Sequence, residues 1–484
     1  MVQTEQMMND TSLFHFLQSI YETGLMQQRN RYSDLIKQSR RIPDGDRYIV
    51  RAPGRVNLIG EHTDYNGYPV LPMAINRDIV LVGVKRSDRV ITVHNSDDRF
   101  PTVTFSLEKP LKADRAGTWS NYVKAAINEL IKNMPAATGF TAWTDGTIPP
   151  AAGLSSSSAL VVGAALMFMK INAIQIEDMD LAERLAKAEH FVGTAGGGMD
   201  QAISLMAQKN HALKLDFFPL RYKTVSVPTD YRVVICHSLL DAPKTEQARR
   251  EYNRRPVECR LATALIAAEL CRAGFSPNNP QRLADVDNDH LPLDKKQYQK
   301  IVGQALLPAS LDWKTLSRRL SLSKEEIATK WSIPDEWIDQ PPAGGFKCWK
   351  RYHHVINEAR RVNKASRALA EGDTESFGLL MYGSHQSCRR KFEISTPELN
   401  ALVDIAWKNG AIGARLTGAG FGGCTVHLVR RSIKEKFMTR LLDDYFAGYL
   451  RKNRPDLLEK HPNFHNAVFT TQAMAGAGCL KSTD

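Results

Sequence analysis

Residues 148–169, IPPAAGLSSSSALVVGAALMFM, constrain the fold of this chain more than any other stretch. A strand-like run and a small-residue turn lead into an apolar helix that is predicted from about Ser156 to Ile174. The first turn of such a helix has free backbone N–H groups and the positive end of the helix dipole, which suit a phosphate. The hydroxyls of Ser155 to Ser158 can cap the helix, donate to phosphate oxygens or bind Mg²⁺. One serine would be sufficient as a cap, so the pattern favours anion binding. A Walker A loop is excluded, because no lysine follows the turn.

Two further glycine-rich stretches follow. In GTAGGGMDQAIS (193–204), three glycines present Asp200 at the start of a helix. The carboxylate could cap that helix, or it could act as a general base beside a substrate hydroxyl. In ARLTGAGFGGCTVHLV (414–429), the glycines lie between two strands, where they could form a bulge or the wall of a nucleotide site.

A fourth stretch, APGRVNLIGEHTDYNGYPV (52–70), begins as a buried strand and ends in a dense polar turn. It contains Arg55, Glu61, His62 and Asp64. Taken alone, this turn is compatible with a helix cap or with a metal site.

Strands and helices mix along the chain without a regular βαβ repeat, which predicts an α+β fold. We expect a strand pair over 47–62 that breaks at Pro53 and Gly54, and a hairpin over 78–96 that turns at 86–88. Helices are predicted over 119–134 and 181–193. The region from about 245 to 390 is predicted to be mostly helical.

The length of 484 residues favours two domains. We expect a helical extension over 1–45, a first domain over 46–230, and a second over 231–484 with a helical insertion near 275–345. Leu13, Phe16, Leu17 and Ile20 share one face of the N-terminal helix. No basic flank precedes an apolar core there, so the stretch does not resemble a secretory signal.

The net charge of +12 raises the possibility of nucleic-acid binding. The basic residues are widely spread and accompany no nucleic-acid motif, so attraction of a small anion such as a nucleotide explains them better. The seven cysteines are scattered without a CxxC pair, which indicates a reducing, cytoplasmic setting. No apolar run is long enough to predict a membrane span.

In this order, the three glycine- and serine-rich stretches resemble the GHMP kinase superfamily. GRVNLIGEHTDYNGYPVLP (54–72) is similar to the signature of its galactokinase branch. The resemblance extends over about 47–270 and 350–430. It implies a ribosomal-S5-domain-2-like first domain, a ferredoxin-like α+β second domain and an active site in the cleft between them. It also implies phosphorylation of the anomeric hydroxyl of galactose, with ATP and Mg²⁺.

The resemblance also assigns roles to matching positions, with Asp200 as the catalytic base and Arg55 as the residue that stabilises phosphoryl charge. The positions implied to bind the sugar are Arg55, Glu61, His62, Asp64, Gly197, Asp200 and Tyr252. Those implied to bind ATP are Gly153, Leu154, Ser155, Ser156 and Ser157, and those implied to bind the metal are Ser157 and Glu189. Carboxylates and a histidine are suitable partners for sugar hydroxyls.

Two alternatives stay open. GTAGGGMDQAIS and the long segment near 275–345 are similar to the N-acetylgalactosamine kinase branch, whereas Tyr252 agrees better with galactokinases. A non-catalytic sensor of galactose and ATP is the second alternative. The complete serine loop, together with Arg55 and Asp200, favours an enzyme.

Overall fold

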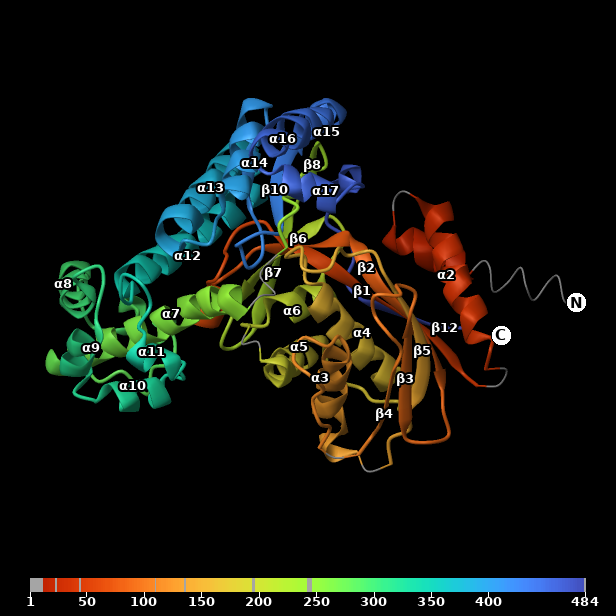
Figure 1. Ribbon diagram of the computed structural model, residues 1–484, viewed down its shortest axis with the longest axis horizontal. Helices are drawn as coiled ribbons and strands as arrows, with labels where there is room; N and C mark the ends of the chain where they lie inside the picture. The colour runs from red at the N-terminus through yellow and green to blue at the C-terminus, as the bar shows by residue number, and fades with distance from the viewer. Residues whose placement is uncertain are drawn as a thin grey trace, which may run out of the picture.

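The computed structural model describes residues 12–21, 24–42, 45–108, 110–134, 136–193, 196–241 and 246–482. Two β-sheets form its framework, and helices cover them (Figure 1). This mixture confirms the predicted α+β class. Among the described helices, none is both long enough and apolar enough to span a membrane.

The larger sheet has six strands in the order β12-β1-β2-β5-β3-β4. They are β1 (Arg47–Asn57), β2 (Pro72–Lys85), β3 (Val90–Asn95), β4 (Val103–Ser106), β5 (Phe140–Gly146) and β12 (Gly478–Ser482). The predicted hairpin over 78–96 is wrong, because β5 lies between β2 and β3. β3 pairs in parallel with β5, and parallel neighbours need a long crossover, which here includes β4 and helix α3 (Ser120–Leu130).

Strand β1 continues through Pro53 and Gly54, where the sequence predicted a break. The break is replaced by a shift of register: Pro53 pairs with Asp78 and Arg55 with Ala74, so residues 75–77 of β2 bulge opposite Gly54. A bulge changes the local twist and re-aims the neighbouring side chains. Arg55 is the first residue after it.

Helices cover one face of the six-stranded sheet. α4 (Ser156–Ile171) and α6 (Met199–Met206) pack on β1 and β2, and α3 and α5 (Asp178–Ala188) pack on these helices. α4 is buried on nearly every side, as its apolar sequence requires. The helices predicted over 119–134, 156–174 and 181–193 are therefore confirmed in position, and each ends a few residues early.

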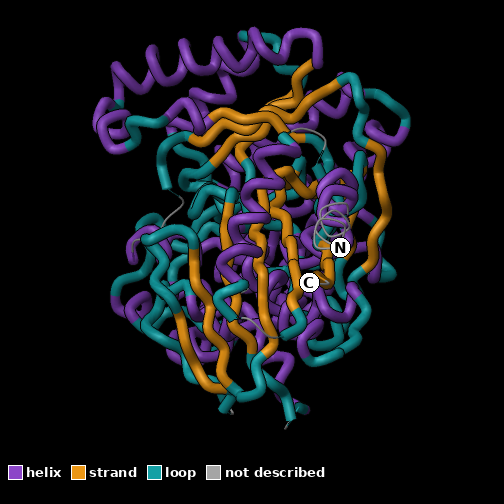
Figure 2. Tube along the Cα trace, turned by 90° about the vertical axis from the view of Figure 1, so that its right-hand side faces the viewer, coloured by secondary structure: helices purple, strands orange, loops and turns teal. Residues whose placement is uncertain are grey.

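The opposite face is covered by a helix over 12–20 and by α2 (Leu25–Ser39), which lie in front of the strands in Figure 2. Leu13, Leu17 and Ile20 are buried and Phe16 packs beside them, as the shared face predicted. Residues 1–11, 22, 23, 43 and 44 of the predicted extension lie outside the described residues.

A smaller sheet of the order β11-β8-β10-β9 forms the second framework. Its strands are β8 (Tyr231–His237), β9 (Gly413–Leu416), β10 (Cys424–Arg430) and β11 (Val468–Thr471). The helices around it are α13 (Thr374–Ser387), α14 (Pro397–Lys408), α15 (Lys434–Leu441), α16 (Arg451–Asn453) and α17 (Pro455–Lys460). A ribbon of β6 (His211–Asp216) and β7 (Arg221–Ser226) joins the larger sheet through a bridge between Val70 and Leu215.

Two long helices, α7 (Glu246–Arg272) and α12 (Cys348–Ala370), extend away from the sheets. The segment near 275–345 lies between them in sequence and forms α8 (Lys295–Leu306), α9 (Trp313–Leu320), α10 (Lys324–Lys330) and α11 (Glu336–Asp339). These helices share a separate apolar core with α7 and α12. The segment also contacts the polar turn after β1, because Tyr68 Oη donates to Asp287 Oδ2 at 2.6 Å.

The end of the chain returns to the larger sheet, where β12 pairs with β1. The predicted division at residue 230 assigns these last residues to the second domain, whereas the strand pairing joins them to the first sheet. A single C-terminal strand cannot be assigned to a sheet from its own sequence, because its partner is distant along the chain.

A buried charge cluster fastens the N-terminal helices to the larger sheet. Asp78 on β2 accepts from Arg31 on α2 at 2.7 Å and from Arg51 on β1 at 2.8 Å, and the hydroxyl of Tyr21 donates to it as well. Burial alone would raise the pKa of Asp78, but the two guanidinium groups hold it below its usual value. The cluster thus joins the N-terminal extension, β1 and β2.

We predict that Asp78→Asn lowers the free energy of unfolding by about 3–5 kcal/mol, because it leaves the buried guanidinium of Arg51 without its carboxylate and Arg31 with Asp145 alone. The matched control is Asp88→Asn, which removes an exposed carboxylate from a surface pair with Arg86 and should change the free energy of unfolding far less. Urea and thermal unfolding of the two variants measure the difference. Equal losses would show that the Asp78 cluster contributes no more than a surface pair.

Candidate active site

An ion pair between Arg55 and Asp200 lies at the centre of the site. Arg55 Nε is 2.7 Å from Asp200 Oδ1, and Arg55 Nη2 is 2.9 Å from Asp200 Oδ2. The third nitrogen, Nη1, donates to the carbonyl oxygen of Gly153 at 2.6 Å. Burial works to lower the pKa of Arg55, but the carboxylate of Asp200 outweighs it and the pKa lies above its ordinary value. The serine loop and the GTAGGGMDQAIS motif therefore both contact Arg55.

The serine loop opens helix α4 as predicted. Ser155 precedes the helix with a left-handed backbone (φ 62°) and makes no capping hydrogen bond to it. Its hydroxyl donates to Asp200 Oδ2 instead, so Ser155 contacts the Arg55–Asp200 pair. Ser156 and Ser157 are half-buried in the first turn. Since no side chain caps that turn, its N–H groups are suited to an anion.

The acidic side chain beside this loop is Glu189, predicted to bind the metal together with Ser157. Its Oε1 accepts from the hydroxyl of Ser158 at 2.6 Å. In the structure, Glu189 is therefore hydrogen-bonded to the residue that follows Ser157. Burial raises the pKa of Glu189 to about 7. The described residues contain no group of three histidine, cysteine or acidic side chains that could hold a metal alone. A hydroxyl and one carboxylate fit a Mg²⁺ ion that keeps waters and takes phosphate oxygens as its other ligands.

The polar turn after β1 meets the second glycine motif through Asp64 and Gly197. Asp64 Oδ2 accepts from the backbone N–H of Gly197 at 3.1 Å. A Cβ on Gly197 would lie only 2.6 Å from the backbone of Asp64, so no larger residue fits without displacing the turn. Burial, with Asp200 nearby, raises the pKa of Asp64 to about 6. Thr194 and Ala195 of the same motif lie outside the described residues.

Glu61 is buried among protein donors. Its Oε1 accepts from Arg415 Nη1 at 3.0 Å and from the N–H of Gly418 at 2.8 Å, and its Oε2 accepts from Asn57 Nδ2 at 3.0 Å. A carboxylate offers about four lone-pair positions. Three of these positions are used by protein donors and one position on Oε2 remains, so most of the carboxylate fastens the turn to β9.

Both nitrogens of His62 have protein partners. Nε2 lies 3.2 Å from the carbonyl oxygen of Ala419, which can only accept, so Nε2 carries the proton. Nδ1 then accepts from the hydroxyl of Tyr65 at 2.9 Å. Burial lowers the pKa of His62 to about 3. The imidazole is therefore neutral, and a sugar hydroxyl would replace one of these two partners.

Tyr252 on α7 completes the predicted set. Its ring lies 5.9 Å from that of His62, and burial raises the pKa of its hydroxyl, with Asp64 and Asp200 nearby. The structure thus brings the turn after β1, the start of α6 and α7 to one place.

Sequence reasoning missed two buried charged residues, Arg415 and Glu358. Arg415 was part of a quoted motif, but its apolar neighbours hid its pairing with Glu61. Glu358 on α12 accepts from the N–H of Gly60 at 3.0 Å and from the hydroxyl of Ser384. A charged residue inside a buried strand is the signal that could have identified Arg415.

The third glycine motif packs against the serine loop. Gly418 has a left-handed backbone (φ 82°), and a Cβ there would lie 2.5 Å from the carbonyl oxygen of Gly153. The glycines are therefore needed for contact between the two loops. A turn of the smaller sheet thus lies directly against the serine loop, which precedes α4.

Comparison with known families agrees with this geometry. "GHMP kinases N terminal domain" matches residues 121–208, and "GHMP kinases C terminal" matches residues 365–446. The fold and the site thus define a kinase of the GHMP class. A third description, "Galactokinase galactose-binding signature", matches residues 40–85.

Individual relatives show which family of the GHMP class the chain belongs to. The chain is 33% identical to a galactokinase of Dictyostelium discoideum, over 98% of each chain. It is 33% identical to a galactokinase of Chloroflexus aurantiacus, over 84% of this chain and 90% of that one. Among solved structures, the chain is similar to Lactococcus lactis galactokinase in complex with galactose, with a TM-score of 0.67 and 26% sequence identity. The superposition covers 92% of this chain and 99% of the Lactococcus lactis chain. The chain belongs to the galactokinase family.

We predict that Gly197→Ala raises the KM for the sugar by about tenfold or more and lowers stability by about 1–3 kcal/mol, because its Cβ would overlap the Asp64 backbone. Gly196→Ala is the matched control, since no atom of the described residues lies within 4 Å of a Cβ at Gly196, apart from its chain neighbours. Steady-state kinetics and thermal unfolding measure both effects. If the two variants behaved alike, contact between Gly197 and Asp64 would not be what positions the turn.

Proposed function

We propose that the protein transfers the γ-phosphoryl group of ATP to the anomeric hydroxyl of galactose, giving galactose 1-phosphate and ADP. The observation that carries this proposal is the Arg55–Asp200 pair, which touches the serine loop through Gly153 and Ser155. The same pair lies beside the polar turn, through the contact of Asp64 with Gly197. A phosphate site and a hydroxyl-binding site therefore share one carboxylate.

In the proposed reaction, Asp200 accepts the proton of the anomeric hydroxyl as its oxygen attacks the γ-phosphorus. The new O–P bond forms as the bond to the β-phosphate oxygen breaks, and ADP leaves. Arg55, which contacts both Asp200 and the serine loop, is proposed to stabilise the phosphoryl charge while it orients the carboxylate. Most of the acceleration in such reactions comes from positioning and electrostatics.

For ATP, we propose that the loop over Gly153 to Ser157 surrounds the phosphates and that the first turn of α4 donates N–H groups to them. The divalent metal is proposed to be Mg²⁺, with Ser157 and Glu189 as its protein contacts. When bound, Mg²⁺ neutralises phosphate charge.

For the sugar, we propose that Glu61, His62, Asp64, Gly197 and Tyr252 bind its hydroxyls. The lone-pair position left on Glu61, the neutral imidazole and the half-buried Asp64 each suit a neutral, hydroxyl-rich ligand. Such a site discriminates by leaving buried polar groups unpaired when the wrong sugar binds.

N-acetylgalactosamine is the second candidate substrate. Two observations favour it: the GTAGGGMDQAIS motif, and the segment near 275–345 that contacts the polar turn through Tyr68 and Asp287. Tyr252 favours galactose, as does the match of residues 40–85 to the galactose-binding signature.

The remaining proposals concern organisation and setting. We propose that the larger and smaller sheets mark the two domains, with a boundary near residue 230.

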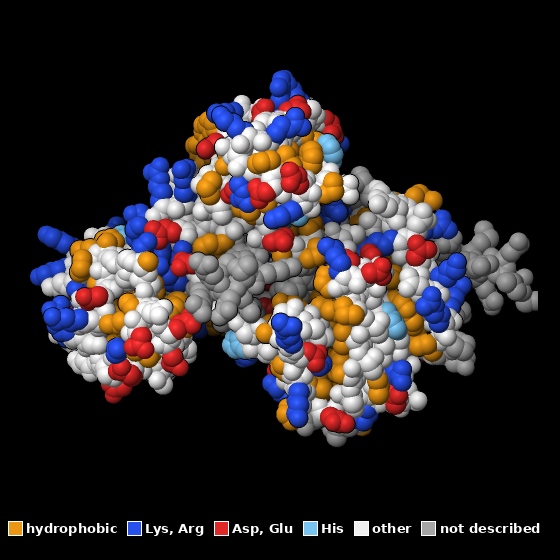
Figure 3. Space-filling view, viewed as in Figure 1, with side chains coloured by type: hydrophobic (Ala, Val, Ile, Leu, Met, Phe, Trp, Pro, Cys, Tyr) orange, Lys and Arg blue, Asp and Glu red, His pale blue; other side chains and the backbone are white. Residues whose placement is uncertain are grey.

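We propose a cytoplasmic setting, which agrees with seven unpaired cysteines. Small molecules are the proposed partners rather than nucleic acid; Figure 3 shows Lys and Arg scattered over this face with Asp and Glu among them.

Steady-state ATP consumption with galactose, N-acetylgalactosamine, galacturonate and arabinose tests the proposal. We expect galactose to have the highest kcat/KM, with at least about a tenfold preference over N-acetylgalactosamine, which must place an extra acetamido group in a site built for hydroxyls. A higher kcat/KM for N-acetylgalactosamine would reverse the substrate assignment. Saturable binding of galactose without turnover of any sugar would contradict an enzyme and favour the non-catalytic sensor of galactose and ATP.

A further inference from the structure

A cavity of about 570 Å³ lies on the side of the larger sheet that carries α2, away from the serine loop. Three parts of the chain line it: the N-terminal helices, the bulge of β2 with the end of β5, and the smaller sheet with α15. Its volume is in the range of small-molecule sites. None of the proposed catalytic or sugar-binding residues lines it.

The lining is strongly cationic. Arg77, Arg232, Arg431 and Lys434 contribute to it, against a single carboxylate, Glu435, which Lys434 holds at 2.7 Å. Among the described residues, no carboxylate forms an ion pair with any of the three arginines. Arg77 is half-buried, with its guanidinium 4.4 Å from the Phe469 ring centroid, and Arg232 donates to backbone carbonyls. Clustered positive charges without counter-charges favour an anionic ligand.

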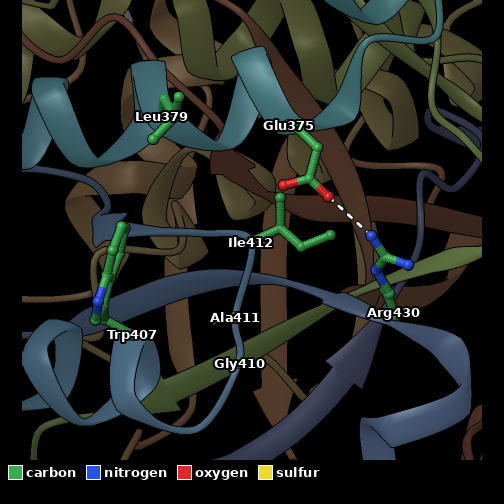
Figure 4. Close-up of a pocket in the computed structure, with 7 residues that line it drawn as sticks. All are labelled: Glu375, Leu379, Trp407, Gly410, Ala411, Ile412 and Arg430. Atoms are coloured by element: carbon green, nitrogen blue, oxygen red, sulfur yellow. Dashed lines mark hydrogen bonds and ion pairs between the residues drawn. The ribbon is translucent and has the colours of Figure 1, made fainter.

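A second cavity, of about 360 Å³, shows the contrast (Figure 4). It also contains an arginine, Arg430, but this guanidinium is paired with Glu375 at 2.8 Å, and the other lining side chains are mainly apolar. Its charge is therefore already balanced by the protein. The cationic cavity lacks this balance.

The uncharged part of the cationic cavity indicates what else the ligand carries. Gln27 and Gln28 offer amide N–H groups of the kind that bind sugar hydroxyls, and the buried Asn76 Oδ1 has no hydrogen-bond partner among the described residues. Arg77 covers one face of the Phe469 ring, and the residue is only 8% exposed, so little of the ring is available to stack on a nucleobase. Arginine forks match phosphate oxygens in geometry. A phosphorylated sugar satisfies both parts of the lining.

The position of the cavity relates it to the active site. Asn76 and Arg77 belong to the bulge of β2 opposite Gly54, directly before Arg55. Thr147, at the end of β5, bonds to the backbone N–H of Asp78 at 3.0 Å and precedes the serine loop. The cavity and the Arg55–Asp200 pair thus lie on opposite faces of the same two strands.

We propose that this cavity is a second ligand site that binds a phosphorylated sugar, with the phosphate held by Arg77, Arg232 and Arg431. The site is separate from the active site and does not depend on the identity of the sugar that the enzyme phosphorylates. Since elements of both sheets and of the N-terminal helices line it, the ligand joins all three parts.

Calorimetric titration with glucose 6-phosphate, at saturating galactose and low salt, tests this proposal. Arg77→Gln and Arg431→Gln should each weaken binding by about tenfold or more, since each removes a charged donor. Arg431 is exposed, so its variant keeps the fold even if Arg77→Gln does not. Arg451→Gln removes an exposed charge outside the cavity and should leave the Kd within about twofold.

Ser157→Ala serves as the control for the serine loop and should also leave this Kd unchanged. The proposal is overturned if glucose 6-phosphate does not bind, if Arg431→Gln behaves like Arg451→Gln, or if Ser157→Ala is the variant that loses binding. Titration with AMP separates the ligand classes: a loss for AMP in Arg431→Gln as large as that for glucose 6-phosphate would contradict the assignment to a phosphorylated sugar.

Discussion

The bidentate ion pair between Arg55 and Asp200 is the interaction on which the site depends. The arginine follows the point where residues 75–77 of β2 bulge opposite β1, and the aspartate lies in the first turn of α6, so the pair fixes a strand of the sheet relative to a helix that covers it. The same arginine binds Gly153, and Ser155 binds the same carboxylate. The loop that would hold the phosphates is thereby positioned relative to the carboxylate that would accept the proton.

Close backbone contacts surround this pair. Gly197 brings the start of α6 against Asp64, and Gly418 brings the turn of the smaller sheet against the serine loop. Buried charges hold the outer parts: Glu61 pairs with Arg415 behind the polar turn after β1, and Asp78 pairs with two arginines beneath the N-terminal helices. A buried charge that loses its partner is costly, so these clusters specify one arrangement of the two sheets.

The sequence predicted those parts of the molecule that local chemistry determines. Helix α4 and its serine loop follow from an apolar run after a small-residue turn, and the polar turn after β1 follows from the density of its charged residues. Strand partners were not predictable, because alternation shows which face a strand buries but not which strand lies beside it. The position of β5 between β2 and β3 was missed for this reason. The partners of Glu61 were also missed, since Arg415 is 354 residues away along the chain.

The kinetics of Asp200→Asn test the central claim most directly. The amide keeps the shape of the carboxylate but cannot accept the proton, so we expect kcat to fall by about a thousandfold, within the range for loss of a general base. The Kd for galactose, measured by calorimetry on the same variant, should stay within about threefold of the parent value, because the substitution leaves the polar turn after β1, which we propose binds the sugar hydroxyls, untouched. A kcat within about tenfold of the parent at an unchanged Kd would contradict the role of Asp200, and with it the account of the site.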